Sequence, residues 1–120
     1  MRKITSEAVD NFLNRSKFKK SNMAVSIEEG ITYLKLHNNK IAALLADGRM
    51  WISNAGWASN TTKERLNGLP NVSVRQKNYR WYLNGTEWDG NPIYINQLWI
   101  KIRLICNELI INELQQILAY

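Results

Sequence analysis

Hydrophobic and polar residues alternate with a period of two through the first half of the chain, which predicts a series of short β-strands. The predicted strands are MAVSIE (23–28) and ITYLKLH (31–37), which alternate, then IAALLA (41–46), which is apolar throughout, and RMWIS (49–53). Residues typical of tight turns separate these segments, namely EG at 29–30, HNNK at 37–40 and DG at 47–48, which is a strong two-residue hairpin signal. Strands joined by such short turns must be antiparallel neighbours.

A second alternating region begins after residue 70. NVSVRQK (71–77) and RWYLNG (80–85) predict another strand pair that turns around Asn78. Trp81 and Leu83 share one face of their strand because successive side chains of a strand point in opposite directions. A tryptophan that alternates with polar neighbours, as Trp81 does, more often belongs to the core than to a binding surface.

Three segments have the spacing of helices. Near the N-terminus, Thr5 is a suitable N-cap, and it precedes a helical apolar face made of Ala8, Val9, Phe12 and Leu13. A two-turn helix is predicted in TTKERLNGLP (61–70), capped by Asn60 or Thr61, with Thr61 and Glu64 in a capping box. Gly68 and Pro70 mark the end of this helix. The third helix is predicted from about Asn96 to Leu118.

Together these elements predict a single α+β domain of 120 residues. We expect an antiparallel sheet of about five strands with an N-terminal helix, a short middle helix and a C-terminal helix. Residues 1–92 form the expected α+β core, and residues 93–120 form a hydrophobic tail. Before the middle helix, Gly56 permits a sharp bend, and Trp57 is expected to cover the core there.

The tail is hydrophobic around most of its predicted circumference, which is typical of a helix that is buried or shared with a partner chain. LWIKIRLI (98–105) also alternates like a strand, so a strand followed by a helix remains an alternative. We expect the tail to pack under the sheet or against a second copy, and we favour a homodimer. The expected dimer contacts are Leu98, Ile102, Ile105 and Leu109.

Charge adds two basic clusters to this picture. The chain has 16 Lys and Arg residues against 10 Asp and Glu residues, a formal charge of +6, which favours polyanions or acidic protein surfaces as partners. A solvated surface is the commoner explanation of such a charge. One cluster consists of Arg15, Lys17, Lys19 and Lys20, and the other of Arg75, Lys77 and Arg80.

The sequence lacks the motifs of common enzyme classes, including the nucleophile elbow, the zinc-protease helix motif and the P-loop. Cys106 is the only cysteine and His37 the only histidine, so neither an internal disulfide nor the usual zinc ligand set can form. An anion site at the start of the middle helix, with Lys63 and Arg65, explains this stretch less fully than helix capping does. We expect a protein that is not an enzyme and binds no cofactor or metal.

The segments ITSEAVDNFLN, FKKSN and LKLHNNKIAALLADGRM, with the stretch that follows them, resemble a group of small bacteriophage proteins. This resemblance covers roughly residues 3–90, is most specific in ISNAGWASNTTKERLNGLPNVSVRQKNYRWYLNGTEWDG, and does not extend beyond Pro92. It implies a phage or prophage origin and expression in the host bacterial cytoplasm, and it transfers no catalytic residues. The charges of residues 1–20 argue against a signal peptide, and those of the tail argue against a membrane span. Small phage proteins of this kind include inhibitors of host defence, anti-CRISPR proteins among them.

The resemblance and the basic, aromatic composition favour a non-enzymatic phage inhibitor that binds a host protein, with a CRISPR-type defence effector or nucleoprotein complex as the favoured target. The alternative is a small nucleic-acid-binding phage protein, in which Tyr79 and Tyr82 would stack on bases. The residues expected to bind the partner are Lys17, Lys19, Lys20, Lys63, Arg65, Arg75, Lys77, Tyr79 and Arg80.

Overall fold

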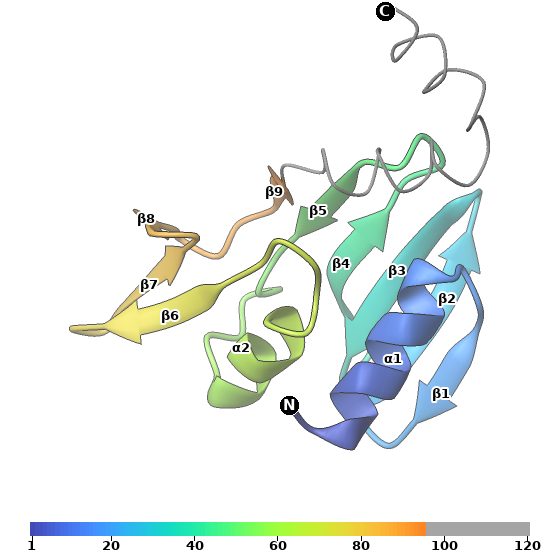
Figure 1. Ribbon diagram of the computed structural model, residues 1–120, viewed down its shortest axis with the longest axis horizontal. Helices are drawn as coiled ribbons and strands as arrows, with labels where there is room; N and C mark the ends of the chain where they lie inside the picture. The colour runs from blue at the N-terminus through green and yellow to red at the C-terminus, as the bar shows by residue number, and fades with distance from the viewer. Residues whose placement is uncertain (96–120) are drawn as a thin grey trace, which may run out of the picture.

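The computed structural model of the protein describes residues 1–95, which form two helices and nine strands in two sheets (Figure 1). The elements are α1 (Lys3–Leu13), β1 (Phe18–Lys20), β2 (Met23–Glu28), β3 (Ile31–Leu36), β4 (Asn39–Leu44), β5 (Met50–Ile52), α2 (Asn60–Leu66), β6 (Val74–Lys77), β7 (Arg80–Leu83), β8 (Thr86–Glu87) and β9 (Ile93–Ile95). The α+β class is confirmed. The expectation of a single sheet of about five strands is wrong in detail, because the strands divide between two sheets.

The larger sheet has six antiparallel strands in the order β1-β2-β3-β4-β5-β9. Its centre is the predicted meander. Glu29 and Gly30 have φ values of 51° and 80°, and His37 and Asn38 have values of 50° and 67°. Positive φ at both central residues matches the right-handed twist of the flanking strands, which is why these short turns make hairpins.

Three features of the larger sheet differ from the prediction. The β4–β5 turn contains three residues, 46–48, because the backbone N–H of Leu45 donates to the carbonyl of Arg49 at 2.8 Å. Phe18–Lys20, expected as a loop, pairs with β2 as an edge strand. The opposite edge is β9, which pairs with β5 although residues 53–92 separate the two strands.

The smaller sheet consists of β6, β7 and β8. The predicted turn at Asn78 is confirmed, and Asn78 and Tyr79 have φ values of 53° and 66°. The alternation predicted for the second strand is also confirmed, because Trp81 and Leu83 are buried.

The core lies between the larger sheet and the two helices, which cover one face of it (Figure 1). α1 packs against β1, β2 and β3, whereas α2 contacts β4 and β6. Ala8, Val9 and Phe12 of α1 are buried as predicted. Buried side chains of the smaller sheet, including Trp81 and Leu83, belong to the same hydrophobic cluster, so both sheets share one core.

The predicted cap of α1 is wrong. The helix begins at Lys3, and its N-cap residue, Arg2, makes no side-chain cap hydrogen bond. Thr5 instead lies within the first turn, where it is completely buried. Its hydroxyl donates to Glu64 Oε1 at 2.5 Å and accepts from Arg65 Nη1 at 3.0 Å, which ties α1 to α2.

The cap of α2 also differs from the prediction. Ser59 is the N-cap, and its Oγ accepts a hydrogen bond from the backbone N–H of Thr62 at 3.1 Å. Thr61 and Glu64 therefore do not form a capping box, because Glu64 reaches across to Thr5. Ser59 satisfies one of the N–H groups that a helix start leaves without an intrahelical partner.

We expect Ser59→Ala to lower the free energy of unfolding by about 1 kcal/mol, because it removes the cap of α2. Thr61→Ala is the matched control, because Thr61 lies in the first turn of the same helix and its hydroxyl does not cap it. This variant should change the free energy of unfolding by less than about 0.5 kcal/mol. Urea unfolding of the two variants measures both values. A larger loss in Thr61→Ala than in Ser59→Ala would contradict the observed cap.

Among residues 1–95, neither helix combines the length and the apolar character needed to cross a membrane. The predicted C-terminal helix lies outside the described residues. The same is true of the expected dimer contacts, which are Leu98, Ile102, Ile105 and Leu109.

Candidate functional site

The two basic clusters lie at opposite ends of the protein (Figure 1). Lys17 directly precedes β1, and Lys19 and Lys20 lie on it, at one edge of the larger sheet. Lys20 Nζ forms an ion pair with Glu7 Oε2 at 3.1 Å. Arg15 turns inward and donates to the carbonyls of residues 44 and 45 at 3.1 and 2.5 Å. The first cluster therefore does not adjoin the second, which lies on the smaller sheet beyond the opposite edge.

The second cluster does form one surface. Arg75 is paired with Tyr82, and Lys77 is paired with Arg80, in the register of β6 and β7. Directly paired residues, and residues two apart on a strand, share a face of the sheet. All four side chains therefore lie on the face opposite the buried Trp81, and we call this set the basic hairpin face.

Two further residues expected to bind the partner lie elsewhere. Arg65 is only 2% exposed and donates from Nη1 to Thr5 Oγ1, from Nη2 to Asn22 Oδ1, and to Glu64 in an ion pair. Its position three residues after Thr62 and next to Leu66 places it on the buried stripe of α2. That spacing was the sequence signal for its burial, and its charge had obscured it.

Lys63 lies on the other side of the β6–β7 hairpin from the basic hairpin face. Its Nζ donates to Gln76 Oε1 at 2.6 Å and lies 5.8 Å from the ring centroid of Trp81. Such contacts hold the ammonium group against an aromatic ring. Lys63 therefore stabilises the packing of α2 on the hairpin.

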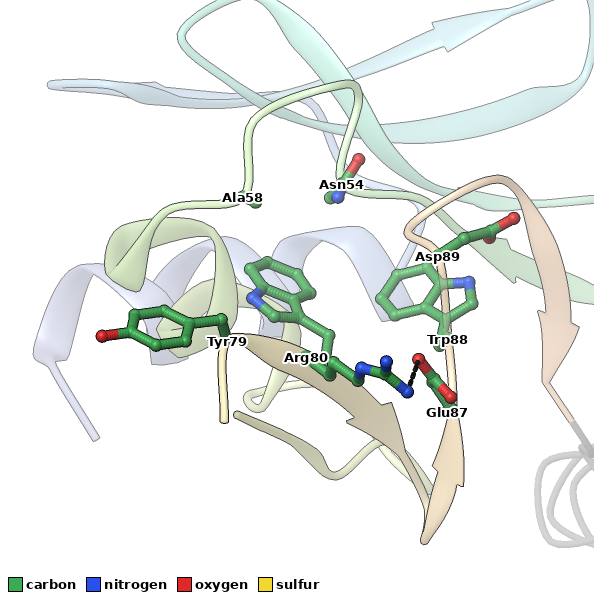
Figure 2. Close-up of a pocket in the computed structure, with 8 residues that line it drawn as sticks. Asn54, Ala58, Tyr79, Arg80, Glu87, Trp88 and Asp89 are labelled. Carbon is green, nitrogen blue, oxygen red and sulfur yellow. Dashed lines mark ion pairs between the residues drawn. The ribbon is translucent and has the colours of Figure 1, made fainter. Parts of the chain in front are cut away.

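An open hollow lies between the loop of residues 54–58 and the strands β7 and β8 (Figure 2). Its volume is about 270 Å³. It is lined by Asn54, Ala58, Tyr79, Arg80, Trp81, Glu87, Trp88 and Asp89. Sequence reasoning placed only Tyr79 and Arg80 in a functional site, because the other residues come from segments that lack any common motif.

Trp81 and Trp88 form the apolar part of the hollow. Their ring centroids are 6.1 Å apart at an interplanar angle of 46°, and each residue is only 7% exposed. The indole Nε1 of Trp88 donates to the carbonyl of Asn91 at 2.9 Å, so its polar group is satisfied. The two indoles therefore provide a rigid aromatic lining.

Two exposed aromatic residues lie beside this lining. Tyr79 is 97% exposed at the tip of the β6–β7 hairpin. Trp57 is 64% exposed and directly precedes Ala58, so the expectation that it covers the core is wrong. The reason is the turn at residues 54–57, in which Ala55 and Gly56 have φ values of 54° and 84° and carry the chain away from the core. We call Trp57 and Tyr79 the aromatic rim.

The charged groups of the hollow have both signs. Arg80 Nη1 and Glu87 Oε1 form an exposed ion pair at 3.5 Å, which Figure 2 marks with a dashed line. Asp89 adds a second carboxylate, whose oxygens accept from the backbone and side chain of Asn91 at 3.0 and 2.9 Å. The hollow thus combines one cation with two anions.

Hydrogen bonds to Gly90 hold the two sides of the hollow together. The carbonyl of Gly90 accepts from the backbone N–H of Asn54 at 2.9 Å and from Ser53 Oγ at 3.2 Å. Asn54 Oδ1 in turn accepts from the N–H of Gly56 at 2.8 Å. The loop that carries Trp57 is therefore fixed against the segment that carries Trp88.

The lining combines aromatic, charged and amide side chains. Its eight residues include no histidine, cysteine, serine or threonine that would form a nucleophile and base pair. Within residues 1–95, no group of three or more His, Cys, Asp or Glu side chains is placed to hold a metal ion.

The described residues thus define a small α+β domain with an aromatic hollow at the junction of its two sheets. The chain belongs to the Kyanoviridae Gp96 protein family, whose model matches residues 1–101. This membership confirms the phage origin that the sequence resemblance implied, and the match extends beyond Pro92, where the resemblance was expected to end. No curated protein and no solved structure matches the chain.

Proposed function

We propose that this protein is a phage-encoded, non-enzymatic inhibitor that binds a host protein at the aromatic rim and the hollow beside it. The favoured target is a bacterial defence effector of the CRISPR type. The observation that carries the proposal is the exposure of Trp57 and Tyr79, 64% and 97%, on the two segments that border one hollow.

Large exposed aromatic side chains beside a preformed concave surface are typical of binding hot spots, which are rich in Trp, Tyr and Arg. Tyr79 has a φ of 66°, a region that bulky residues rarely adopt and that Asn or Gly usually occupies in such turns. A strained residue of this kind is a reason to suspect function. The turn holds the phenol ring of Tyr79 away from the domain, where the partner protein can contact it.

The charges of the hollow favour a protein over a nucleic acid at this place. Glu87 and Asp89 would repel phosphate groups, whereas a protein surface offers both signs of charge as partners. The basic hairpin face lies on the same hairpin as Tyr79 and suits an acidic part of the target. If the target is a nucleoprotein complex, that face also suits its nucleic acid.

The test is affinity capture of the full chain from infected host cells, with and without nuclease, followed by direct binding to the purified partner. We expect one bacterial protein to be captured equally with and without nuclease. The Trp57→Leu/Tyr79→Leu variant should bind it at least about thirty-fold more weakly, the loss expected when hot-spot contacts are removed. Tyr94→Leu is the matched control, because Tyr94 is also exposed but lies on β9, away from the hollow, and it should bind the nuclease-treated partner normally.

Equal binding by wild type and the double variant would refute the role of the aromatic rim. Capture that disappears with nuclease would favour the nucleic-acid alternative. The choice of target has a separate test: expression of the wild-type chain should raise the plating of a phage that the host CRISPR system targets, whereas the double variant should not. Unchanged plating with the wild type would overturn the CRISPR assignment.

A further inference from the structure

The face of the larger sheet opposite the two helices carries a row of aromatic side chains. In the strand register, Tyr33 lies opposite Ala43, Ala43 opposite Trp51, and Trp51 opposite Tyr94. Directly paired residues share a face. The neighbouring positions Met50 and Ile52 are buried in the core, so these four residues point away from it.

The row is continuous and accessible at its edge. The ring centroids of Tyr33 and Trp51 are 6.4 Å apart at an interplanar angle of 62°, and only the small side chain of Ala43 lies between them in the register. Tyr94 is 56% exposed on the edge strand β9. Because neighbouring strands are about 4.8 Å apart, the row from β3 to β9 spans about 14 Å.

Two cations lie over the rings of this row. Lys40 Nζ is 3.9 Å from the ring centroid of Tyr33, and Arg49 Cζ is 5.3 Å from that of Tyr94. The register adds Lys35 beside Lys40, on the same face. Tyr33, Trp51, Tyr94, Lys40 and Arg49 together are called the aromatic sheet face below.

Two carboxylates accompany these cations. Glu28 lies 3.5 Å from Lys35 and 3.6 Å from Lys40, and Asp47 lies 2.7 Å from Arg49. A hydrogen bond from Ser26 keeps the pKa of Glu28 below its usual value, and the lysines act in the same direction, so this carboxylate is ionised at neutral pH. Exposed ion pairs contribute little stability, so phosphate groups can compete for the cations.

We propose that the aromatic sheet face binds single-stranded nucleic acid. Bases stack on Tyr33, Trp51 and Tyr94, and the phosphates between them contact Lys40 and Arg49. An antiparallel sheet with aromatic rings on its outer face accommodates about two or three stacked bases, which matches the span of the row. A duplex is excluded from this contact because its bases are already stacked on each other.

This site is separate from the hollow proposed to bind a host protein. None of its five residues lines the hollow. The aromatic sheet face lies on the larger sheet, whereas the hollow is lined by residues 54 and 58 and by residues 79–89 of the smaller sheet and the segment after it. A target that contains both protein and nucleic acid would engage both surfaces. The nucleic-acid site does not depend on the protein site, and each has its own variants.

The test is fluorescence anisotropy of the full chain with labelled oligo(dT) and oligo(U) of about ten nucleotides, a length within the range of known single-strand sites. We expect binding at micromolar protein and low salt. The logarithm of the binding constant should fall with the logarithm of the salt concentration with a slope near −1.4, for about two phosphate contacts. A duplex of the same length should bind more weakly.

The deciding comparison uses pairs of identical substitutions. Tyr94→Leu should weaken binding about ten-fold, the effect of losing one stacked base, whereas Tyr79→Leu on the hairpin should leave it unchanged. Tyr94→Phe keeps the ring and should retain affinity. In a second pair, Trp51→Leu should weaken binding about ten-fold, whereas Trp57→Leu should leave it unchanged. Lys40→Gln/Arg49→Gln should reduce both the affinity and the salt slope without altering the fold.

Three results would overturn the proposal. Absence of binding by the full wild-type chain at low salt would mean that another occupant, such as residues 96–120 or a second copy, covers this face. Equal loss in Tyr79→Leu and Tyr94→Leu would move the nucleic acid to the hairpin. Equal affinity for duplex and single strand would exclude base stacking as its basis.

Discussion

Replacing Arg65 with methionine is expected to lower the free energy of unfolding by about 3 kcal/mol, the loss typical of removing one partner from a buried ion pair. Arg65 is 2% exposed, and its guanidinium joins Thr5 of α1, Asn22 before β2 and the neighbouring Glu64. Methionine fills similar space but cannot donate, so Thr5 and Glu64 lose a partner inside the domain. For a domain of this size, the melting temperature should fall by more than about 10 °C.

Arg49→Met is the matched control for this prediction. Arg49 also pairs with a carboxylate, that of Asp47 at 2.7 Å, but both side chains are about half exposed. Its loss should cost less than about 1 kcal/mol. The Glu64→Gln/Arg65→Met variant should be less destabilised than the sum of its single changes, because no charge is then left without its partner. Similar urea midpoints for Arg65→Met and Arg49→Met would show that the buried network contributes no more than a surface pair.

Replacing Gly90 with alanine is the second change for which we expect a large effect, a loss of about 3 kcal/mol. Gly90 has a φ of 88°, where an L side chain is strained. A Cβ there would lie 2.0 Å from Asn54 Nδ2 and 2.4 Å from Asn54 Cγ. Alanine would therefore displace Asn54, break the hydrogen bonds between the two sides of the hollow and add the cost of a disrupted loop to that of the strained φ.

Gly85→Ala separates these two costs. Gly85 has the same φ of 88°, yet nothing lies within 4 Å of the position of an added Cβ. It should lose only about 1 kcal/mol, the backbone cost alone. Asn54→Ala combined with Gly90→Ala should recover part of the difference, because it removes the clashing side chain. Equal losses at Gly85 and Gly90 would show that the contact with Asn54 has no energetic consequence.

Much of the fold was predictable because its signals are local. The hairpins of residues 23–53 depend only on neighbouring residues, and the register of β2, β3, β4 and β5 confirms their antiparallel order, although the β4–β5 turn has three residues. The grouping of Arg75, Lys77 and Arg80 was predictable for the same reason, since one hairpin carries all three. The short helix predicted before Pro70 is also confirmed, as α2, although Ser59 rather than Asn60 or Thr61 caps it.

The two proposed binding surfaces were far less predictable, because residues distant in sequence build them. The hollow joins residues 54 and 58 to residues 79–89, and the aromatic sheet face is complete only because β9 pairs with β5. Trp57 was expected to be buried because tryptophan is large and apolar, yet the turn before it directs it outward. Composition cannot show which of several tryptophans the core has room for.

The sequence by itself determined the α+β class and the hairpins, since backbone preference and a period of two act within a few residues. Only the tertiary structure decided which partners the buried Arg65 has, because Thr5 lies 60 residues away. It also decided that the two basic clusters lie at opposite ends of the protein. Such outcomes depend on which surfaces meet when the elements pack, and packing optimises the whole core rather than any one segment.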